Sequence, residues 1–148
     1  MRNDRPPPEP LASAVGFLLS FNGQRMARTF AQSLEPLGLR PPQFGLLRLI
    51  QSRPGSTQQE LVASSMIDPS SMVAVLDELE ELGLVERRQN PADRRKHAVH
   101  LTDEGEATLR KARRIADSVA ARELAPLNAD ERDTLRRLLR KLAGVDED

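Results

Sequence analysis

Three cations stand side by side in the segment NPADRRKHAVHLT, residues 90–102. Arg94, Arg95 and Lys96 follow Asp93, and the flanking runs LVERR and AVHL both contain apolar residues. Two such runs joined by a polar loop predict a β-hairpin with the cations at its tip. Cations on a projecting tip could neutralise phosphates or enter a narrow, negatively charged groove of nucleic acid. The alternative is a solvated tip whose charges have no partner.

Charge is unevenly distributed along a chain whose formal net charge is zero. Residues 11–56 hold five arginines and one glutamate, a local balance of +4. Residues 68–82 hold five acids and no basic residue, which gives −5, whereas residues 84–100 hold five cations and two acids, which gives +3. The net value therefore conceals separate acidic and basic segments.

Composition limits the classes of protein to consider. With 148 residues, 39% hydrophobic and 30% charged, the chain is expected to form one globular domain. It has no cysteine, so disulfides and thiolate metal sites are excluded. The N-terminal MRNDRPPPEP, residues 1–10, predicts a disordered or extended lead and lacks a signal peptide pattern. No apolar run is long enough to cross a membrane, and a cytoplasmic location is expected.

The cations need elements to position them, and the first half of the chain predicts helices. Apolar residues recur at helical spacing from 11 to 34, and Pro36 and Gly38 end that helix. A second helix begins at Pro41 and stops before Pro54.

A helix-turn-helix is predicted next. Thr57 and Glu60 form a capping box that opens a short helix. Asp68 and Pro69 open a longer amphipathic helix, which Gly83 ends. A short helix, a tight turn and an amphipathic helix are the layout of this DNA-binding motif.

The predicted hairpin follows at once, with strands at 84–88 and 96–101 and a loop at 89–95. Thr102 then caps a long helix to about residue 124, and Asn128 caps a last helix that ends at Gly144. A helix-turn-helix followed by a basic hairpin is typical of a winged helix. The expected fold is thus mainly α with a small β-hairpin wing (α+β).

Residues 68–105, DPSSMVAVLDELEELGLVERRQNPADRRKHAVHLTDEG, resemble the MarR family of multiple-antibiotic-resistance-type regulators. The motifs GLVERR, NPADRR and LTDEG occur in the family's order, and the similarity covers about residues 11–144. It implies a single domain over 11–146, with dimerisation helices at 11–40 and 103–144 and a winged helix-turn-helix lobe at 41–102. It also implies a homodimeric repressor that binds a pseudo-palindromic operator in double-stranded DNA. A small aromatic or amphipathic anion would release or modulate it.

Nine residues are predicted to contact DNA: Thr57, Gln58, Ser70, Ser71, Val73, Ala74, Arg94, Arg95 and Lys96. Val73 and Ala74 stand where the family commonly has a Thr-Arg pair, so they could touch only a thymine methyl. Ser70 and Ser71 would then offer hydroxyls to phosphates, and affinity would depend mainly on the wing.

Two acids are candidates for orienting wing arginines. The resemblance implies that Asp93 orients Arg95, and Asp77 could do the same for an arginine at the wing base. The alternatives are a turn residue for Asp93 and an ordinary helix-surface acid for Asp77.

Apolar residues suggest two further surfaces. Phe17, Phe21, Met26 and Phe44 could line a ligand pocket between the lobe and the dimerisation helices, although for each residue taken singly a plain core position is the simpler interpretation. The last helix has an apolar stripe that a small lobe could not cover alone, made of Leu135, Leu138, Leu139 and Leu142.

Catalysis, metal binding and a cofactor are not expected. His97 and His100 are three residues apart in a strand and so point to opposite faces, which argues against a shared metal. A different class of function stays open: the acidic stretch 68–82 would suit a winged-helix module that binds a basic protein and no DNA.

Overall fold

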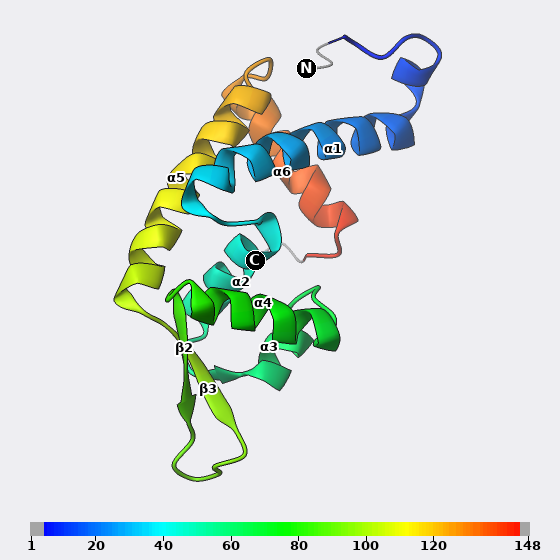
Figure 1. The fold of residues 1–148 in the computed structure, drawn as a ribbon. Coiled ribbons are helices and arrows are strands. Elements are labelled where there is room, and N and C mark those ends of the chain that lie inside the picture. Colours follow the sequence, from blue (N-terminus) through cyan, green and yellow to red (C-terminus); the bar gives the residue numbers. More distant parts are fainter. Residues whose placement is uncertain (1–4, 146–148) are drawn as a thin grey trace.

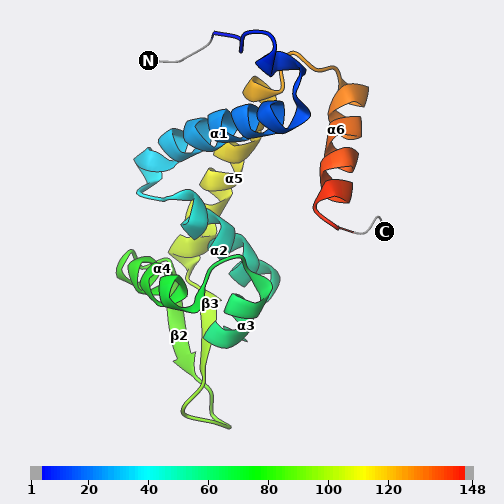
Figure 2. The ribbon, with the colours of Figure 1, turned by 90° about the vertical axis from the view of Figure 1, so that its right-hand side faces the viewer.

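The computed structural model describes residues 5–145, which form a helical body and a small winged lobe (Figures 1 and 2). The rest of the predicted lead, residues 1–4, and position 146 of the predicted domain lie outside the described residues. The helices are α1 (Val15–Leu34), α2 (Pro41–Ser52), α3 (Gln58–Ser64), α4 (Pro69–Glu81), α5 (Asp103–Glu123) and α6 (Ala129–Leu142), with short 3-10 turns η1 (Leu11–Ser13) and η2 (Glu35–Leu37). The strands are β1 (Ser56–Thr57), β2 (Val85–Gln89) and β3 (His97–Leu101).

The first helix begins later than its apolar spacing predicts. The expected start at residue 11 is wrong, because η1 is separated from α1 by Ala14, which is extended (φ −92°, ψ 115°). The Ser13 hydroxyl donates to the Pro10 carbonyl oxygen at 2.6 Å, and the Ser13 N–H donates to the same residue's carbonyl at 3.2 Å. These bonds close a tight turn onto the proline segment, so the α-helix starts only beyond it.

Helices α2, α3 and α4 enclose the core of the lobe. Each contributes apolar side chains from one face, as their spacing predicts. The fully buried members are Leu46, Leu47, Ile50, Leu61, Met72, Leu76 and Leu79. The opposite face of α4 is left exposed.

A three-stranded antiparallel sheet in the order β1-β3-β2 carries the wing. Arg87 pairs with Val99 in the hairpin, and Thr57 of β1 pairs with Ala98 on the other edge of β3. The two residues of β1 are too few to show alternation, which is why the strand was not predicted. Its pairing ties the start of α3 to the wing.

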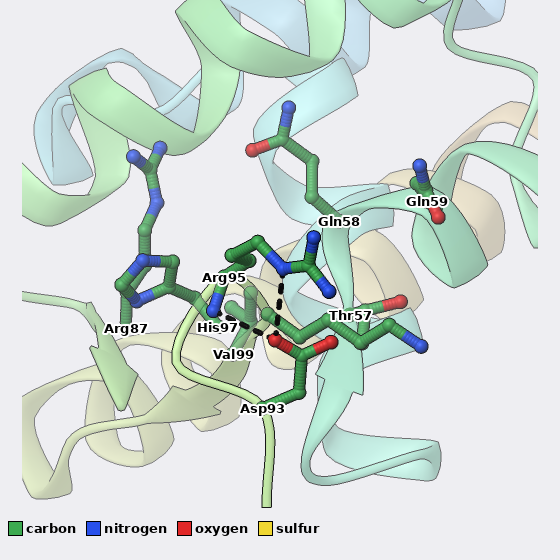
Figure 3. A pocket seen from close by; sticks show the side chains of 9 residues that line it. Thr57, Gln58, Gln59, Arg87, Asp93, Arg95, His97 and Val99 are labelled. Carbon is green, nitrogen blue, oxygen red and sulfur yellow. Dashed lines mark hydrogen bonds and ion pairs between the residues drawn. The ribbon is translucent and has the colours of Figure 1, made fainter. Parts of the chain in front are cut away.

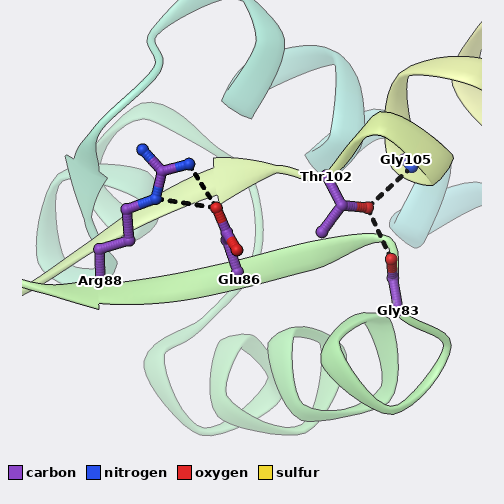
Figure 4. A network of polar contacts seen from close by, with 5 residues as sticks. All are labelled: Gly83, Glu86, Arg88, Thr102 and Gly105. Carbon is purple, nitrogen blue, oxygen red and sulfur yellow. Dashed lines mark hydrogen bonds and ion pairs between the residues drawn. The ribbon is translucent and has the colours of Figure 1, made fainter.

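The wing joins α5 at a close approach of two backbones (Figure 4). The Thr102 hydroxyl donates to the Gly83 carbonyl oxygen at 2.6 Å and accepts from the Gly105 N–H at 3.0 Å. A Cβ on Gly105 would lie 2.0 Å from the Leu84 carbonyl oxygen, so no side chain fits there. The LTDEG motif thus sets the angle between sheet and helix.

The body consists of α1 and α5 packed side by side, with α6 folded back from the end of α5 (Figures 1 and 2). The Arg132 Nε–H donates to the carbonyl oxygens of Leu124 and Leu127, which closes the turn between α5 and α6. No residue of α6 is buried, although Leu138, Leu139 and Leu142 lie on it. Within residues 5–145, no helix combines the length and apolar character needed to cross a bilayer.

Candidate nucleic-acid interface

The first turn of α4 is organised around Asp68, its N-cap. Asp68 Oδ1 accepts from the Ser70 hydroxyl at 2.7 Å and the Ser71 N–H at 3.0 Å, and Oδ2 accepts from the Ser71 hydroxyl at 2.7 Å. These bonds hold the pKa of the Asp68 carboxyl well below its usual range, and the bond from the Ser71 hydroxyl contributes most to this lowering. The hydroxyl hydrogens expected to face phosphates therefore point at Asp68.

The outer face of α4 continues with small apolar side chains. Val73 is 43% exposed and Ala74 is also exposed, whereas Met72 and Val75 are buried on the opposite face. Helical periodicity places Ser70, Val73 and Ala74 on one outward surface. This surface has no side-chain donor beyond the first turn.

Three of the four acids in the second half of α4 are paired with groups from other elements. Asp77 accepts from Arg87 Nη2 of β2 at 2.6 Å, and Glu80 lies 3.5 Å from Arg87 Nε. Glu78 accepts from Arg40 and, at 2.8 Å, from the side chain of Gln43. These contacts hold α4 to the wing base and to the start of α2. The −5 balance of this stretch is thus partly neutralised inside the lobe.

The hairpin loop projects beyond α3 and α4 in both ribbon views (Figures 1 and 2). Asp93 Oδ1 accepts from the Arg95 N–H at 3.1 Å and lies 3.3 Å from Arg95 Nε (Figure 3). The Arg95 side chain is 92% exposed. Asp93 therefore has both features considered for it: it forms a turn bond with the backbone and it contacts the arginine that it was expected to orient.

A cleft of about 470 Å³ lies between the start of α3 and the wing (Figure 3). Four of the residues predicted to contact DNA line it, Thr57, Gln58, Arg95 and Lys96, together with Asp93, which was predicted to orient a wing arginine. Sequence reasoning missed its other lining residues, Gln59, Arg87, His97 and Val99. Period-two alternation from Val99 could have placed His97 and Arg95 on one side, but the approach of α3 depends on the β1–β3 pairing.

Thr57 also has a structural role in this cleft. Its hydroxyl accepts from the Glu60 N–H at 3.2 Å, while the Glu60 carboxylate accepts from the Thr57 N–H at 3.1 Å. This is the capping box that the sequence predicts. Gln58 and Gln59, the two residues of α3 that line the cleft, take no part in this capping box.

The four residues predicted for a ligand pocket fall into separate places. Phe17 and Phe21 stack on α1 with ring centroids 6.0 Å apart. Phe44 is buried and meets Phe30 edge-on at 5.2 Å, while Met26 is half-buried. Neither the cleft above nor a hollow of about 730 Å³ between η2, α2 and the end of α4 is lined by any of the four. Their role as a ligand pocket stays a prediction.

Two histidines flank the wing sheet without meeting. His97 lines the cleft, whereas the His100 ring lies 3.4 Å from the position that a Cβ on Gly55 would take. Among residues 5–145, no three His, Cys, Asp or Glu side chains are grouped so that they could hold a metal ion.

Comparisons with known proteins agree with this geometry. Residues 39–97 match the model of the MarR family. The HTH-type transcriptional repressor Rv2887 of Mycobacterium tuberculosis is 33% identical over 88% of this chain and 94% of its own. The transcriptional repressor CouR bound to a 23-mer DNA duplex superposes with a TM-score of 0.84 at 34% identity, over 94% of this chain and 99% of that one. CouR from Rhodococcus jostii RHA1 bound to p-coumaroyl-CoA superposes with a TM-score of 0.79 at 30% identity, over 95% of this chain and 99% of that one.

Proposed function

The chain belongs to the MarR family, and from this we propose that it is a transcriptional repressor that binds double-stranded DNA as a homodimer. The observation that carries the proposal is the pairing of an exposed outer face on α4, which includes Ser70, Val73 and Ala74, with an arginine-bearing wing beside it. In a winged helix, the recognition helix (here α4) enters the major groove, and the wing contacts the DNA backbone or the adjacent minor groove. Relatives of similar length are repressors, and one is bound to a DNA duplex.

Two copies of the lobe would bind the two halves of a pseudo-palindromic operator. Residues 11–40 and 103–144 would form the dimerisation region, and residues 41–102 the DNA-binding lobe. The exposed leucines of α6 support this division, because they leave an apolar face that nothing in the described chain covers. A two-fold axis would match the symmetry of the operator.

A small ligand would modulate DNA binding. Support comes from CouR, which has been solved both on DNA and with p-coumaroyl-CoA. A ligand at the junction of body and lobe would act by changing the spacing of the two α4 helices, provided that it binds one spacing more tightly. The aromatic residues of α1 and α2 are the candidates for contacting it. A regulatory role of this kind needs no catalysis, and the chain is expected to act in the cytoplasm.

An electrophoretic titration against duplex DNA at low and moderate salt tests the DNA-binding role. A protein that uses wing cations on phosphates loses affinity steeply as salt rises. Affinity that is absent at every salt concentration would instead favour the module that binds a basic protein. The paired state of Asp77, Glu78 and Glu80 weighs against that alternative, because these acids already contact cations and an amide of the same chain.

A further inference from the structure

The hydrogen-bond direction in the first turn of α4 limits what this helix can read. The Ser70 and Ser71 hydroxyls both donate to Asp68, at 2.7 Å each. The Ser71 N–H donates to the same carboxylate, and Pro69 has no N–H. Every side-chain donor of residues 68–71 is therefore used within the turn.

Acceptors are what remains on this surface. The Asp68 carboxylate is ionised near neutral pH, because its pKa lies well below the usual range, so it has no proton to donate. Each serine oxygen keeps lone pairs that can accept. Val73 and Ala74 follow on the exposed face with no polar side-chain atom. From 68 to 74 the outward side chains thus offer acceptors and then methyl groups.

We propose that the first turn of α4 selects a base with an exocyclic amino group, adenine or cytosine, and that Asp68 is the residue that determines this choice. The inference rests on the proposed function, in which α4 enters the major groove. There the donors are the adenine N6 and cytosine N4 amino groups, whereas guanine presents two acceptors and thymine an acceptor and a methyl. Val73 and Ala74 would favour a thymine methyl at the neighbouring base pair.

Guanine is disfavoured for two reasons that act together. Turning a serine hydroxyl toward guanine O6 would break a hydrogen bond to an ionised carboxylate, which is stronger than one between neutral groups. Asp68 would then face acceptor atoms without a donor between them, and an unsatisfied group at an interface is costly. The arrangement also removes three donors from phosphate binding, since Asp68 accepts from the Ser71 N–H and from both serine hydroxyls.

Selection from a duplex library with randomised half-sites tests the inference in the full-length protein. The parent is expected to enrich one base pair at one position of each half-site, with its adenine or cytosine on the strand that the first turn of α4 contacts. Asp68→Asn keeps a good N-cap while exchanging one acceptor oxygen for an amino donor. At that position we expect its preference against guanine to fall by about 5- to 10-fold, the value of one hydrogen bond. Asp117→Asn, on the exposed surface of α5, makes the same charge change and should affect all sequences equally.

A second measurement removes the amino group from the DNA. An operator with 2′-deoxynebularine in place of the selected adenine, or with a 2-pyrimidinone deoxynucleoside in place of the selected cytosine, should bind the parent about 5-fold more weakly. A Ser70→Ala, Ser71→Ala double variant should lose less than the parent does on this substitution, because part of the acceptor set is gone. Circular dichroism would establish that the variants are folded.

Two outcomes overturn the inference. If Asp68→Asn shifts affinity for all sequences as Asp117→Asn does, the carboxylate acts only as a cap and a charge. If the amino-free operators bind the parent as the original does, no acceptor reads the base. A parent protein that enriches no sequence would contradict the proposed DNA-binding function itself, and the inference would fall with it.

Discussion

Single residues set two features of this protein that composition cannot reveal. Gly105 is required because the α5 backbone touches the Leu84 carbonyl oxygen, and Asp68 is required because it gathers the donors at the start of α4. Gly105 is required by the space available, and Asp68 by its hydrogen bonds. A substitution at each of these two positions tests its role.

Replacing Gly105 with alanine should destabilise the fold. A Cβ 2.0 Å from a backbone oxygen forces the wing and α5 apart, and overpacking of this kind costs about 1–3 kcal/mol. The free energy of unfolding from urea titration measures the loss. Gly45→Ala is the matched control, because no atom within 4 Å would meet its Cβ and a helix interior favours alanine over glycine. Equal stability of the two variants would contradict the close approach.

Stability should depend on the Asp68 carboxylate at acid pH. Its pKa is lowered on folding, so the stabilisation is fully present above the unfolded value of about 3.9 and is lost as pH falls through the lower folded value. Asparagine does not titrate. The difference in urea midpoint between parent and Asp68→Asn should therefore be constant near neutrality and shrink below about pH 4. A difference that stays constant into strong acid would show that these hydrogen bonds do not favour the ionised form.

At the scale of elements, the wing and α4 divide the work of binding. The wing carries exposed cations, whereas the outer face of α4 carries acceptors and methyl groups, and three of its acids contact Arg87 or Arg40. Arginine on phosphate or in a narrow groove contributes affinity. We therefore expect the wing to provide affinity and α4 to provide discrimination.

Arg94→Ala and Arg95→Ala should each weaken operator binding by about 1–3 kcal/mol and lower the salt slope by about one per lost phosphate contact. Asp93→Ala separates the two interpretations of Asp93 by the sign of its effect. If the carboxylate orients Arg95, binding weakens, and the loss disappears in a variant that already lacks Arg95. If it is only a surface acid, its removal near phosphate tightens binding. Wing variants that bind like the parent at moderate salt would contradict this division.

At the scale of the whole molecule, α6 lacks a packing partner within the described residues. The helix is capped by Asn128 and amphipathic, yet none of its residues is buried. Isolated helices of this length are marginal in water, so a packing partner is expected. A second copy of the chain would provide one, since α1 also exposes Val15 and Leu19.

Charging this face should disrupt the dimer. Leu138→Glu with Leu142→Glu places two carboxylates on side chains that are 46% and 72% exposed in one chain. Sedimentation velocity at micromolar concentration should show a dimer for the parent and a monomer for the variant. Leu82→Glu is the control, because Leu82 is similarly exposed, at 45%, but follows α4. A parent that sediments as a stable folded monomer would contradict the dimer.

Much of the fold could be predicted from the sequence because its signals are local. Thr57, Asp68, Thr102 and Asn128 cap their helices through bonds to residues three positions on, and these contacts form wherever the helix forms. Apolar periodicity likewise depends only on neighbours along the chain. The helix-turn-helix and the hairpin followed from these signals, whereas the contact between Asp93 and Arg95 was expected only from the resemblance to the family.

Tertiary structure alone decided which distant groups meet. Arg40 and Gln43 contact Glu78 of α4, and β1 brings α3 to the wing. An arginine at the wing base was considered for Asp77 from the sequence, but only the structure identifies it as Arg87. Such pairings depend on how the elements pack, and the spacing of residues along the chain does not show which elements will lie next to each other. Sequence therefore determined that α4 is acidic, whereas packing decided that Asp77, Glu78 and Glu80 contact other parts of the lobe, while Ser70, Val73 and Ala74 stay exposed.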